Sequence, residues 1–215
     1  MRDTSGFWFA NRQFMWIYSN IGDSARAMKY RRNLYELAKT FPNEKRFQNF
    51  MEMSSRFLGQ YFLNKDQLDS ASFYLSQSYR IAKTFFPNSQ IMSFSTSSWG
   101  NYHLKLQQYD SALWYYKLSN FYASADLGND MIIGNHLAMA HVYLLKDKVD
   151  SAFVSANKAL FEARSIPDTL DMIDAAKMVA TVFEKTKQWD SAFNYLKKSE
   201  ELQNRMAIQE NKQCQ

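Results

Sequence analysis

The sequence predicts an all-α protein in which about five antiparallel helix hairpins stack into an α-solenoid. Three observations lead to this fold class. An Asp-Ser-Ala triplet returns at a nearly constant interval, and small residues stand at fixed distances from it. The 215-residue chain also contains only six glycines and three prolines, few for a protein rich in strands and turns.

The Asp-Ser-Ala triplet sets the period of the sequence. Its four clear copies are 41, 40 and 40 residues apart, and a looser copy lies 46 residues upstream. In chain order the copies are Asp23-Ser24-Ala25, Asp69-Ser70-Ala71, Asp110-Ser111-Ala112, Asp150-Ser151-Ala152 and Asp190-Ser191-Ala192. A constant period of this length is typical of a repeat protein. Each Asp is expected to begin the second helix of its hairpin, where a carboxylate accepts from free backbone amides.

Small residues around each triplet predict where helices touch. A small residue precedes each clear Ala by twelve positions, which lets the two backbones of a hairpin approach closely: Gly59, Gly100, Ala140 and Ala180. Another follows it by seven positions and is expected to admit the next hairpin: Ser78, Ser119, Ala159 and Ser199.

These spacings predict one domain over residues 1–215. The repeats are expected at about 6–41 (a degenerate copy), 43–86, 88–127, 129–166 and 168–199. Residues 200–215 are mostly polar and are expected to form a capping or linker helix, because the end of a solenoid needs a solvated face.

The pattern resembles the tetratricopeptide repeat (TPR), whose signature is W-x2-L-G-x2-Y, then A-x3-F, then P. The second repeat matches best, with Leu58-Gly59-Gln60-Tyr61, Ala71 and Leu75, and Pro87. The period of 40 exceeds the roughly 34 residues of the family by close to two helical turns. The resemblance implies a right-handed superhelix whose concave surface, lined by the first helices, binds peptides or proteins.

Carrying the family's groove positions onto this chain gives a polar, mildly basic set on four first helices. The set is Arg56, Gln60, Asn64, Ser97, Asn101, Lys105, His141, Lys177, Thr181 and Lys185, with Leu137 beside His141. The alternative interpretation is that these residues are simply solvated surface. The carboxylate-clamp variant of the family is disfavoured because Ser97 and Ser98 stand where it needs a charge.

The sequence gives no basis for a catalytic site, a metal site or a cofactor. It lacks the common nucleotide-binding, nucleophile-elbow and zinc motifs. His136 and His141 are five residues apart, about 140° around a helix, so they do not share a face as ligands. His103 occupies a packing position of the repeat, and Cys214 lies in a polar tail. The chain is therefore not expected to be an enzyme.

Two stretches leave other functions open. Residues 26–46 contain seven basic and two acidic residues, and the whole chain has a net charge of +5. This basic stretch is a candidate surface for nucleic acid. A solvated amphipathic helix explains that stretch better, so nucleic acid is disfavoured as a partner. The aromatic segment 7–18 is a candidate surface for self-association, because an end hairpin cannot bury every face.

The leading hypothesis is a non-catalytic scaffold that binds a protein or peptide partner. The last helix is similar to linkers in membrane-anchored bacterial sensor proteins, which implies a sensor or adaptor region of a signalling protein. No signal peptide or membrane span is recognised in the sequence. The compartment therefore stays open between a cytoplasmic protein and a trimmed periplasmic sensor fragment.

Overall fold

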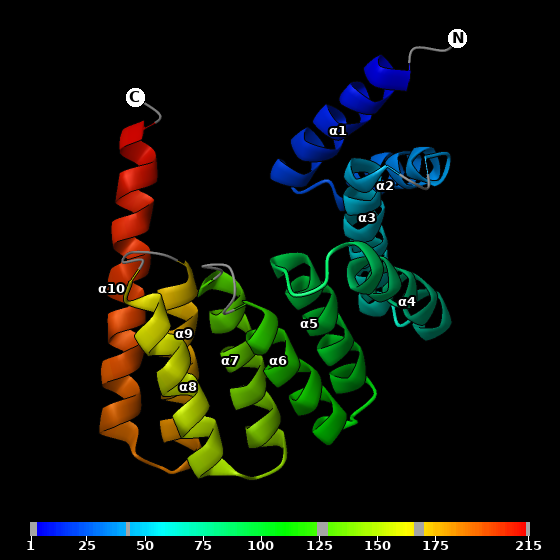
Figure 1. Ribbon diagram of the computed structural model, residues 1–215. Helices are drawn as coiled ribbons and strands as arrows, with labels where there is room; N and C mark the ends of the chain where they lie inside the picture. The colour runs from blue at the N-terminus through cyan, green and yellow to red at the C-terminus, as the bar shows by residue number, and fades with distance from the viewer. Residues whose placement is uncertain (1–3, 42–43, 124–128, 166–169, 214–215) are drawn as a thin grey trace. The chain divides into compact units, whose positions relative to one another are not determined.

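The computed structural model describes residues 4–41, 44–123, 129–165 and 170–213, and every regular element within them is an α-helix (Figure 1). The helices are α1 (Thr4–Asn20), α2 (Ser24–Lys39), α3 (Lys45–Asn64), α4 (Leu68–Phe85), α5 (Gln90–Lys105), α6 (Tyr109–Ala123), α7 (Asn129–Leu145), α8 (Val149–Ala163), α9 (Leu170–Lys185) and α10 (Trp189–Gln213). The predicted all-α solenoid of helix hairpins is confirmed. The chain forms two compact units, Met1–Lys105 and Leu106–Gln215.

Unit 1 contains α1 to α5, and neighbouring helices pack in chain order. α3 also packs on α5, as first helices of successive hairpins do in a solenoid. Much of the interior is polar, because hydroxyl side chains fill positions where a solenoid usually holds aliphatic ones. The fully buried hydroxyl residues of this unit are Ser54, Ser55, Ser78, Ser93, Ser95 and Thr96.

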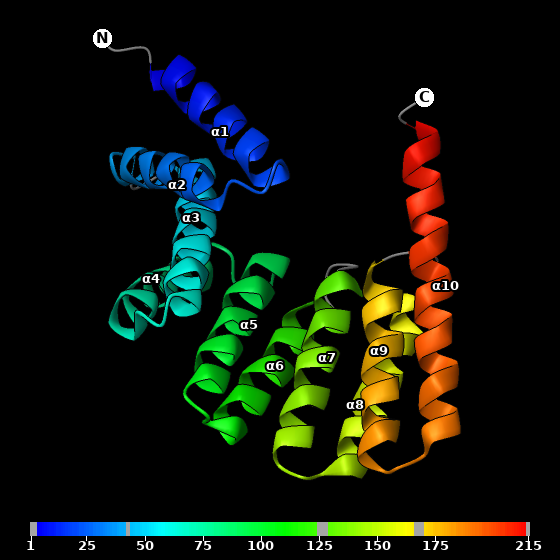
Figure 2. The ribbon, with the colours of Figure 1, turned by 180° about the vertical axis from the view of Figure 1, so that it is seen from behind.

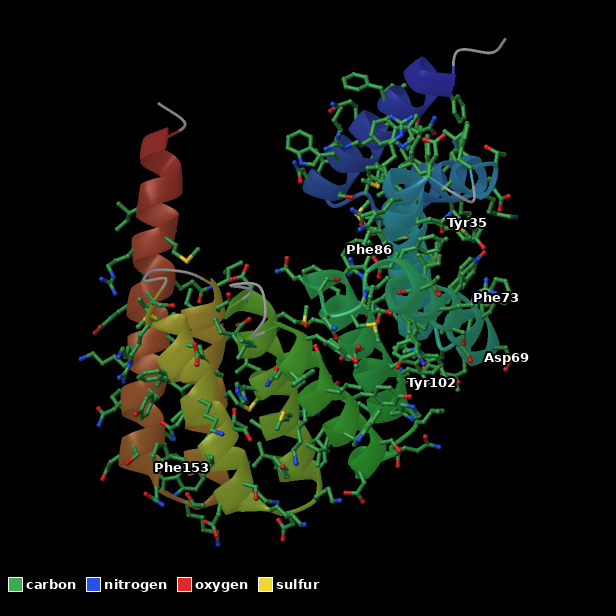
Figure 3. The ribbon with its side chains drawn as sticks, in the orientation of Figure 1. Tyr35, Asp69, Phe73, Phe86, Tyr102 and Phe153 are labelled. Atoms are coloured by element: carbon green, nitrogen blue, oxygen red, sulfur yellow. The ribbon has the colours of Figure 1, made fainter. Side chains whose placement is uncertain are left out.

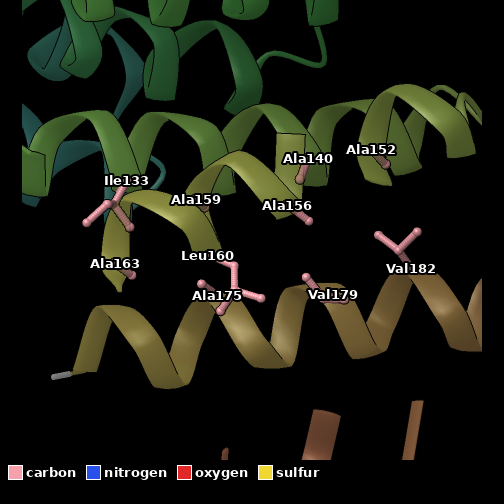
Figure 4. Close-up of a cluster of buried hydrophobic side chains, with 10 residues drawn as sticks. All are labelled: Ile133, Ala140, Ala152, Ala156, Ala159, Leu160, Ala163, Ala175, Val179 and Val182. Atoms are coloured by element: carbon pink, nitrogen blue, oxygen red, sulfur yellow. The ribbon is translucent and has the colours of Figure 1, made fainter. Parts of the chain in front are cut away.

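Unit 2 contains α6 to α10, again packed in chain order, with α7 also packed on α9. Its core is lined mainly by alanine (Figure 4). The cluster consists of Ile133, Ala140, Ala152, Ala156, Ala159, Leu160, Ala163, Ala175, Val179 and Val182. Small side chains at these positions let α7, α8 and α9 pack at short range.

The predicted small residues are buried at every clear repeat. Gly59, Gly100, Ala140 and Ala180 are buried on the first helices, and Ala71, Ala112, Ala152 and Ala192 on the second. The third position is buried as well: Ser78, Ser119, Ala159 and Ser199. A Cβ atom at Gly59 would meet Leu75, one turn beyond Ala71, so the tightest contact lies one turn further along α4 than predicted.

The triplet Asp is the second residue of its helix, one position later than predicted. α4, α6, α8 and α10 each begin one residue before it, and Asp69, Asp110, Asp150 and Asp190 lie in the first turn. There a carboxylate still interacts favourably with the positive end of the helix dipole. Only the looser copy is a cap: the Asp23 side chain accepts a hydrogen bond from the Arg26 backbone amide at 3.0 Å.

The same left-handed turn joins both helices at each clear triplet. Three residues before each triplet Asp, a residue that is not glycine adopts a φ of 57–58°: Asp66, Gln107, Asp147 and Lys187. After α3 the amide of Gln67 donates to the Phe62 carbonyl and the amide of Asp66 to the Leu63 carbonyl. These two hydrogen bonds together form a Schellman motif, which normally prefers glycine at the left-handed position.

Two features fall beyond what the repeat pattern indicated. α10 runs unbroken from Trp189 to Gln213, so residues 200–213 are the second half of the helix that begins at the last triplet. Its outer face carries an exposed apolar stripe, Trp189, Phe193 and Leu196, at helical spacing. That residues 1–215 form a single domain stays a prediction.

Candidate peptide-binding surfaces

The predicted groove residues lie on α3, α5, α7 and α9, and within each helix they follow one face. On α3, α5 and α9 they recur every fourth residue, and four residues are close to one helical turn. The two units are described separately. Arg56, Gln60, Asn64, Ser97, Asn101 and Lys105 form the unit-1 surface, and Leu137, His141, Lys177, Thr181 and Lys185 form the unit-2 surface.

The unit-1 surface is a hydrogen-bonded network between α3 and α5. The amide nitrogen of Asn101 donates to Gln60 Oε1 at 3.2 Å, and Gln60 Nε2 donates to Asn64 Oδ1 at 3.1 Å. Lys105 Nζ lies 2.6 Å from Asp66 Oδ1 in the turn after α3. The structure therefore brings these predicted residues together, but they largely satisfy one another.

Arg56 behaves differently from the rest of the unit-1 surface. Its side chain is only 18% exposed, and its Nε lies 3.2 Å from Glu52 Oε1. The guanidinium stacks over the rings of Phe57 and Phe94, at 4.8 and 4.9 Å from their centroids. Arg56 thus links α3 to α5 mainly as a packing element.

Glu52, the partner of Arg56, is a buried carboxylate that is 1% exposed. It also accepts a hydrogen bond of 2.9 Å from Ser78 Oγ on α4, and Ser78 lies 3.0 Å from Ser95 Oγ on α5. Burial raises the pKa of Glu52, while the positive charge of Arg56 and the Ser78 hydroxyl oppose that increase. This carboxylate holds three helices together at their polar interface.

The unit-2 surface contains a cavity between α7 and α9, which lie side by side in Figure 2. It has a volume of about 380 Å³ and is lined by His141, Leu144, Leu145, Thr181, Glu184 and Lys185. His141, Lys177 and Thr181 are exposed, and Lys185 Nζ lies 3.1 Å from Asp147 Oδ1 in the turn after α7. The lining combines two leucines with an imidazole, a hydroxyl, a carboxylate and an ammonium group.

A second cavity in unit 2, on α8, was missed from the sequence. It has a volume of about 810 Å³ and its lining includes His136, Phe153, Val154, Lys158 and Phe161 (Figure 3 labels Phe153). Phe161 is 70% exposed. Burial, followed by the charge of Lys158, lowers the pKa of His136. The sequence did carry a signal for this cavity. Phe153, Val154 and Phe161 are apolar residues of α8 that do not belong to its cluster of buried alanines.

The basic stretch 26–46 does not present a uniform positive surface. Arg26 pairs with Asp23 at 3.0 Å, Lys39 with Glu36 at 2.9 Å and Arg46 with Glu44 at 3.1 Å. Arg31 is buried, with its guanidinium 3.6 Å from the centroid of Phe57. Many of the basic side chains that would bind nucleic-acid phosphates therefore already interact with local carboxylates or aromatic rings.

The aromatic helix α1 buries one face against α2 and leaves the other open. Trp8 packs edge-on against Phe50 at 4.8 Å, and Tyr18 stacks on Tyr30 at 5.5 Å. Large apolar side chains remain exposed around the rest of α1, of which Trp16 is 60% exposed: Phe7, Phe9, Phe14, Trp16 and Ile17, with Ile21 in the turn that follows. This is the exposed aromatic area expected from segment 7–18.

The described ranges of the chain contain neither a metal-binding cluster nor a membrane-spanning helix. No group of three or more His, Cys, Asp or Glu side chains is placed to hold a metal ion there. Among the helices those ranges contain, none is long and apolar enough to cross a membrane. Cys214 lies outside the described residues.

Comparison with solved structures gives a consistent fold. BtubC from P. vanneervenii superposes with a TM-score of 0.72 at 13% identity, over 90% of this chain and 78% of that one. A putative kinesin light chain of nearly identical TPR-like repeats from Podosopora anserina gives 0.68 at 13% identity, over 97% and 99%. Aspartyl phosphate phosphatase F from Bacillus subtilis gives 0.62 at 16% identity, over 93% of this chain and 59% of that one.

Comparison by sequence gives no relative. A scan against protein-family models finds no match, and a search of curated proteins finds none either. The solved structures share 13–16% of their residues with this chain, so the likeness concerns the fold.

Proposed function

Since the chain has the fold of a TPR-type α-solenoid, we propose that it is a non-catalytic scaffold that binds a protein or peptide partner along its odd-numbered helices. One observation carries this proposal. The cavity between α7 and α9 is lined at the predicted positions His141, Thr181 and Lys185 by side chains that can recognise an extended peptide.

The lining of that cavity fits a peptide better than a small metabolite. Leu144 and Leu145 offer an apolar floor for one side chain, while Thr181, Lys185 and Glu184 can bind the amides and charges of an extended backbone. The volume of about 380 Å³ lies at the lower end of ligand pockets, which suits a single anchoring side chain. We infer that this unit-2 cavity makes the first contact with the partner.

The unit-1 surface has a different part in this proposal. Because Gln60, Asn64 and Asn101 are bonded to one another, a ligand must compete with existing hydrogen bonds to reach them. Arg56 is ion-paired with buried Glu52, so a ligand carboxylate would have to replace that partner. A ligand therefore binds the unit-1 surface less readily than it binds the unit-2 cavity.

We further propose that the chain is a sensor or adaptor region in signalling and that it self-associates through α1. The fold likeness to aspartyl phosphate phosphatase F supports the first proposal as an analogy. The exposed aromatic side chains of α1 support the second, because a large exposed apolar patch commonly marks an interface.

Selection from a random peptide library on the immobilised protein tests the binding proposal. We expect enriched peptides to lose binding by at least about tenfold in the triple variant His141→Ala, Lys177→Ala and Thr181→Ala, because each lost polar contact costs about 0.5–1.5 kcal/mol. The matched control replaces three exposed residues of the even-numbered helices, Lys117→Ala, Asn194→Ala and Lys197→Ala. Equal losses in both variants, or no enriched peptide, would contradict the proposal.

A further inference from the structure

Buried polar atoms of three side chains, one each on α1, α2 and α3, lack hydrogen-bond partners. They are Trp8 at its Nε1, Arg31 at its Nε and Nη1, and Ser54 at its Oγ. Of the described part of the chain, only His136 in unit 2 adds another such side chain. Buried polar groups are nearly always paired, so three on neighbouring helices of one unit indicate a missing partner.

The three side chains follow one face of α3. Trp8 packs against Phe50 at 4.8 Å, and the Arg31 guanidinium lies 3.6 Å from the Phe57 centroid. Ser54 is one turn beyond Phe50 and one turn before Phe57, so it faces the same way as both rings. The indole of α1, the guanidinium of α2 and the hydroxyl of α3 therefore lie along one face of α3, with Ser54 between the other two.

Side chains rather than backbones connect α1 to α3. Among the described residues, α1 packs on α2 and α2 on α3, while the backbones of α1 and α3 do not approach each other. Trp8 spans the interval between α1 and α3 through its contact with Phe50.

Arg31 is the energetically unusual member of the group. It is 7% exposed, and within the described ranges it has no carboxylate partner. Burial, followed by the like charge of Arg56, lowers the pKa of Arg31 to about 10, so it remains positive at neutral pH. A buried cation without a counter-charge is strongly unfavourable, whereas nearby Arg56 has Glu52 as its partner.

The chemistry of the unpartnered atoms defines the missing group. An indole nitrogen and a guanidinium can only donate hydrogen bonds, and a serine hydroxyl can donate as well. Their common complement is an acceptor with several oxygens and a negative charge, which an arginine binds through two parallel bonds. Arg31 packs on the Phe57 ring and is 7% exposed, so little water reaches its charge.

We propose that the junction of α1, α2 and α3 is a binding site for an oxyanion, with Arg31, Ser54 and Trp8 as its donors. The anion is a small carboxylate or phosphate, or the carboxylate of an acidic residue that a partner inserts. This site lies on different helices from the unit-2 cavity, so it holds or fails independently of the proposed peptide surface.

Thermal unfolding at constant ionic strength tests the site, with inorganic phosphate, acetate or chloride as the varied anion. A ligand that binds only the folded state raises Tm with its concentration. We expect phosphate or acetate to raise Tm and chloride to leave it unchanged. Tryptophan fluorescence should titrate in parallel, and Trp8→Phe should lose that signal.

Arg31→Met is the decisive variant. Its loss of charge-assisted hydrogen bonds should weaken the anion's apparent affinity by at least about tenfold. Without anion its Tm should equal or exceed that of the wild type, because an unpaired buried charge has been removed. A residue with a purely structural role would instead lower Tm. The matched control is Arg32→Met on the next position of α2, an exposed arginine over the Phe62 ring, which should keep the full response.

Two further variants and a peptide comparison complete the test. Should Arg31→Met fail to fold, Ser54→Ala and Trp8→Phe should still each weaken the anion response. A short glutamate peptide, compared with its glutamine version, identifies the source: a response to the glutamate peptide alone assigns the anion to a partner. The proposal is overturned if phosphate, acetate and the glutamate peptide all leave Tm and fluorescence unchanged, or if Arg31→Met keeps the full response.

Discussion

Gly59 of α3 and Leu75 of α4 lie so close that no other residue fits at position 59 without movement. A Cβ atom there would be 2.6 Å from both Cγ and Cδ2 of Leu75 and 3.2 Å from its backbone nitrogen. Both residues are buried. The glycine is therefore what lets the two helices of this hairpin meet at the observed distance.

Gly59→Ala should destabilise the protein. Overpacking against Leu75 costs about 1–3 kcal/mol, and the better helix propensity of alanine offsets about 1 kcal/mol, so a net loss of up to about 2 kcal/mol is expected. Urea denaturation measures this difference. Gly134→Ala is the matched control: Gly134 is exposed in α7 with nothing near its missing side chain, and it should gain up to about 1 kcal/mol. Changes of the same sign in both variants would refute the argument.

Glycine at the left-handed turn positions should stabilise the hairpins. Lys187 has a φ of 58° and Gln107 has the same value, a conformation that strains a side chain with a Cβ atom. Lys187→Gly and Gln107→Gly should each raise the free energy of unfolding by about 0.5–1 kcal/mol. Lys177→Gly, in the exposed interior of α9, should lower it by about 1 kcal/mol. A stability loss at the turn positions would show that the turn has no strain to relieve.

Glu52 should make stability fall with rising pH. Burial raises its folded-state pKa above 4.5, so between 4.5 and the raised value the unfolded chain binds fewer protons at Glu52 than the folded chain. The free energy of unfolding should decline through that window and become constant above it. Glu52→Gln cannot titrate and should lack this decline, while the exposed Glu36→Gln should retain it. Parallel pH curves for the wild type and Glu52→Gln would contradict the assignment.

Self-association through α1 should respond to charge on its outer face. Trp16 is exposed on that face, and Trp16→Glu should shift the species seen by light scattering toward the monomer. Trp189→Glu places the same change on an equally exposed tryptophan of α10, in the other unit, and should leave the distribution unchanged. A wild type that is monomeric at high concentration would remove this interface.

Periodicity was enough to predict the helices, the hairpins and the buried small residues, because the same packing requirement recurs in every repeat. It misplaced the triplet Asp by one position. The reason is the left-handed turn: its residue is Asp66, Gln107, Asp147 or Lys187, and no glycine marks it in the sequence. Spacing of four also predicted which groove residues share a face, since a helix alone sets that relationship.

The roles of individual site residues could not be predicted in the same way. Arg56 has groove spacing, yet its surroundings depend on Ser78 of α4 through Glu52 and on Phe94 of α5. In the sequence Arg31 belongs to a basic stretch that is expected to be exposed, but in the structure it packs on the Phe57 ring of α3 and is buried. Such contacts join residues more than twenty positions apart, so only the folded chain reveals them.

The serine-rich interior of unit 1 and the alanine-lined interior of unit 2 give one chain two kinds of cohesion. Hydroxyl contacts such as Ser78 to Ser95 exchange hydrogen bonds with water on unfolding, while the alanine cluster exposes apolar area and so carries more of the heat-capacity increment. The halves should consequently respond unequally to temperature, and calorimetry should resolve more than one melting transition.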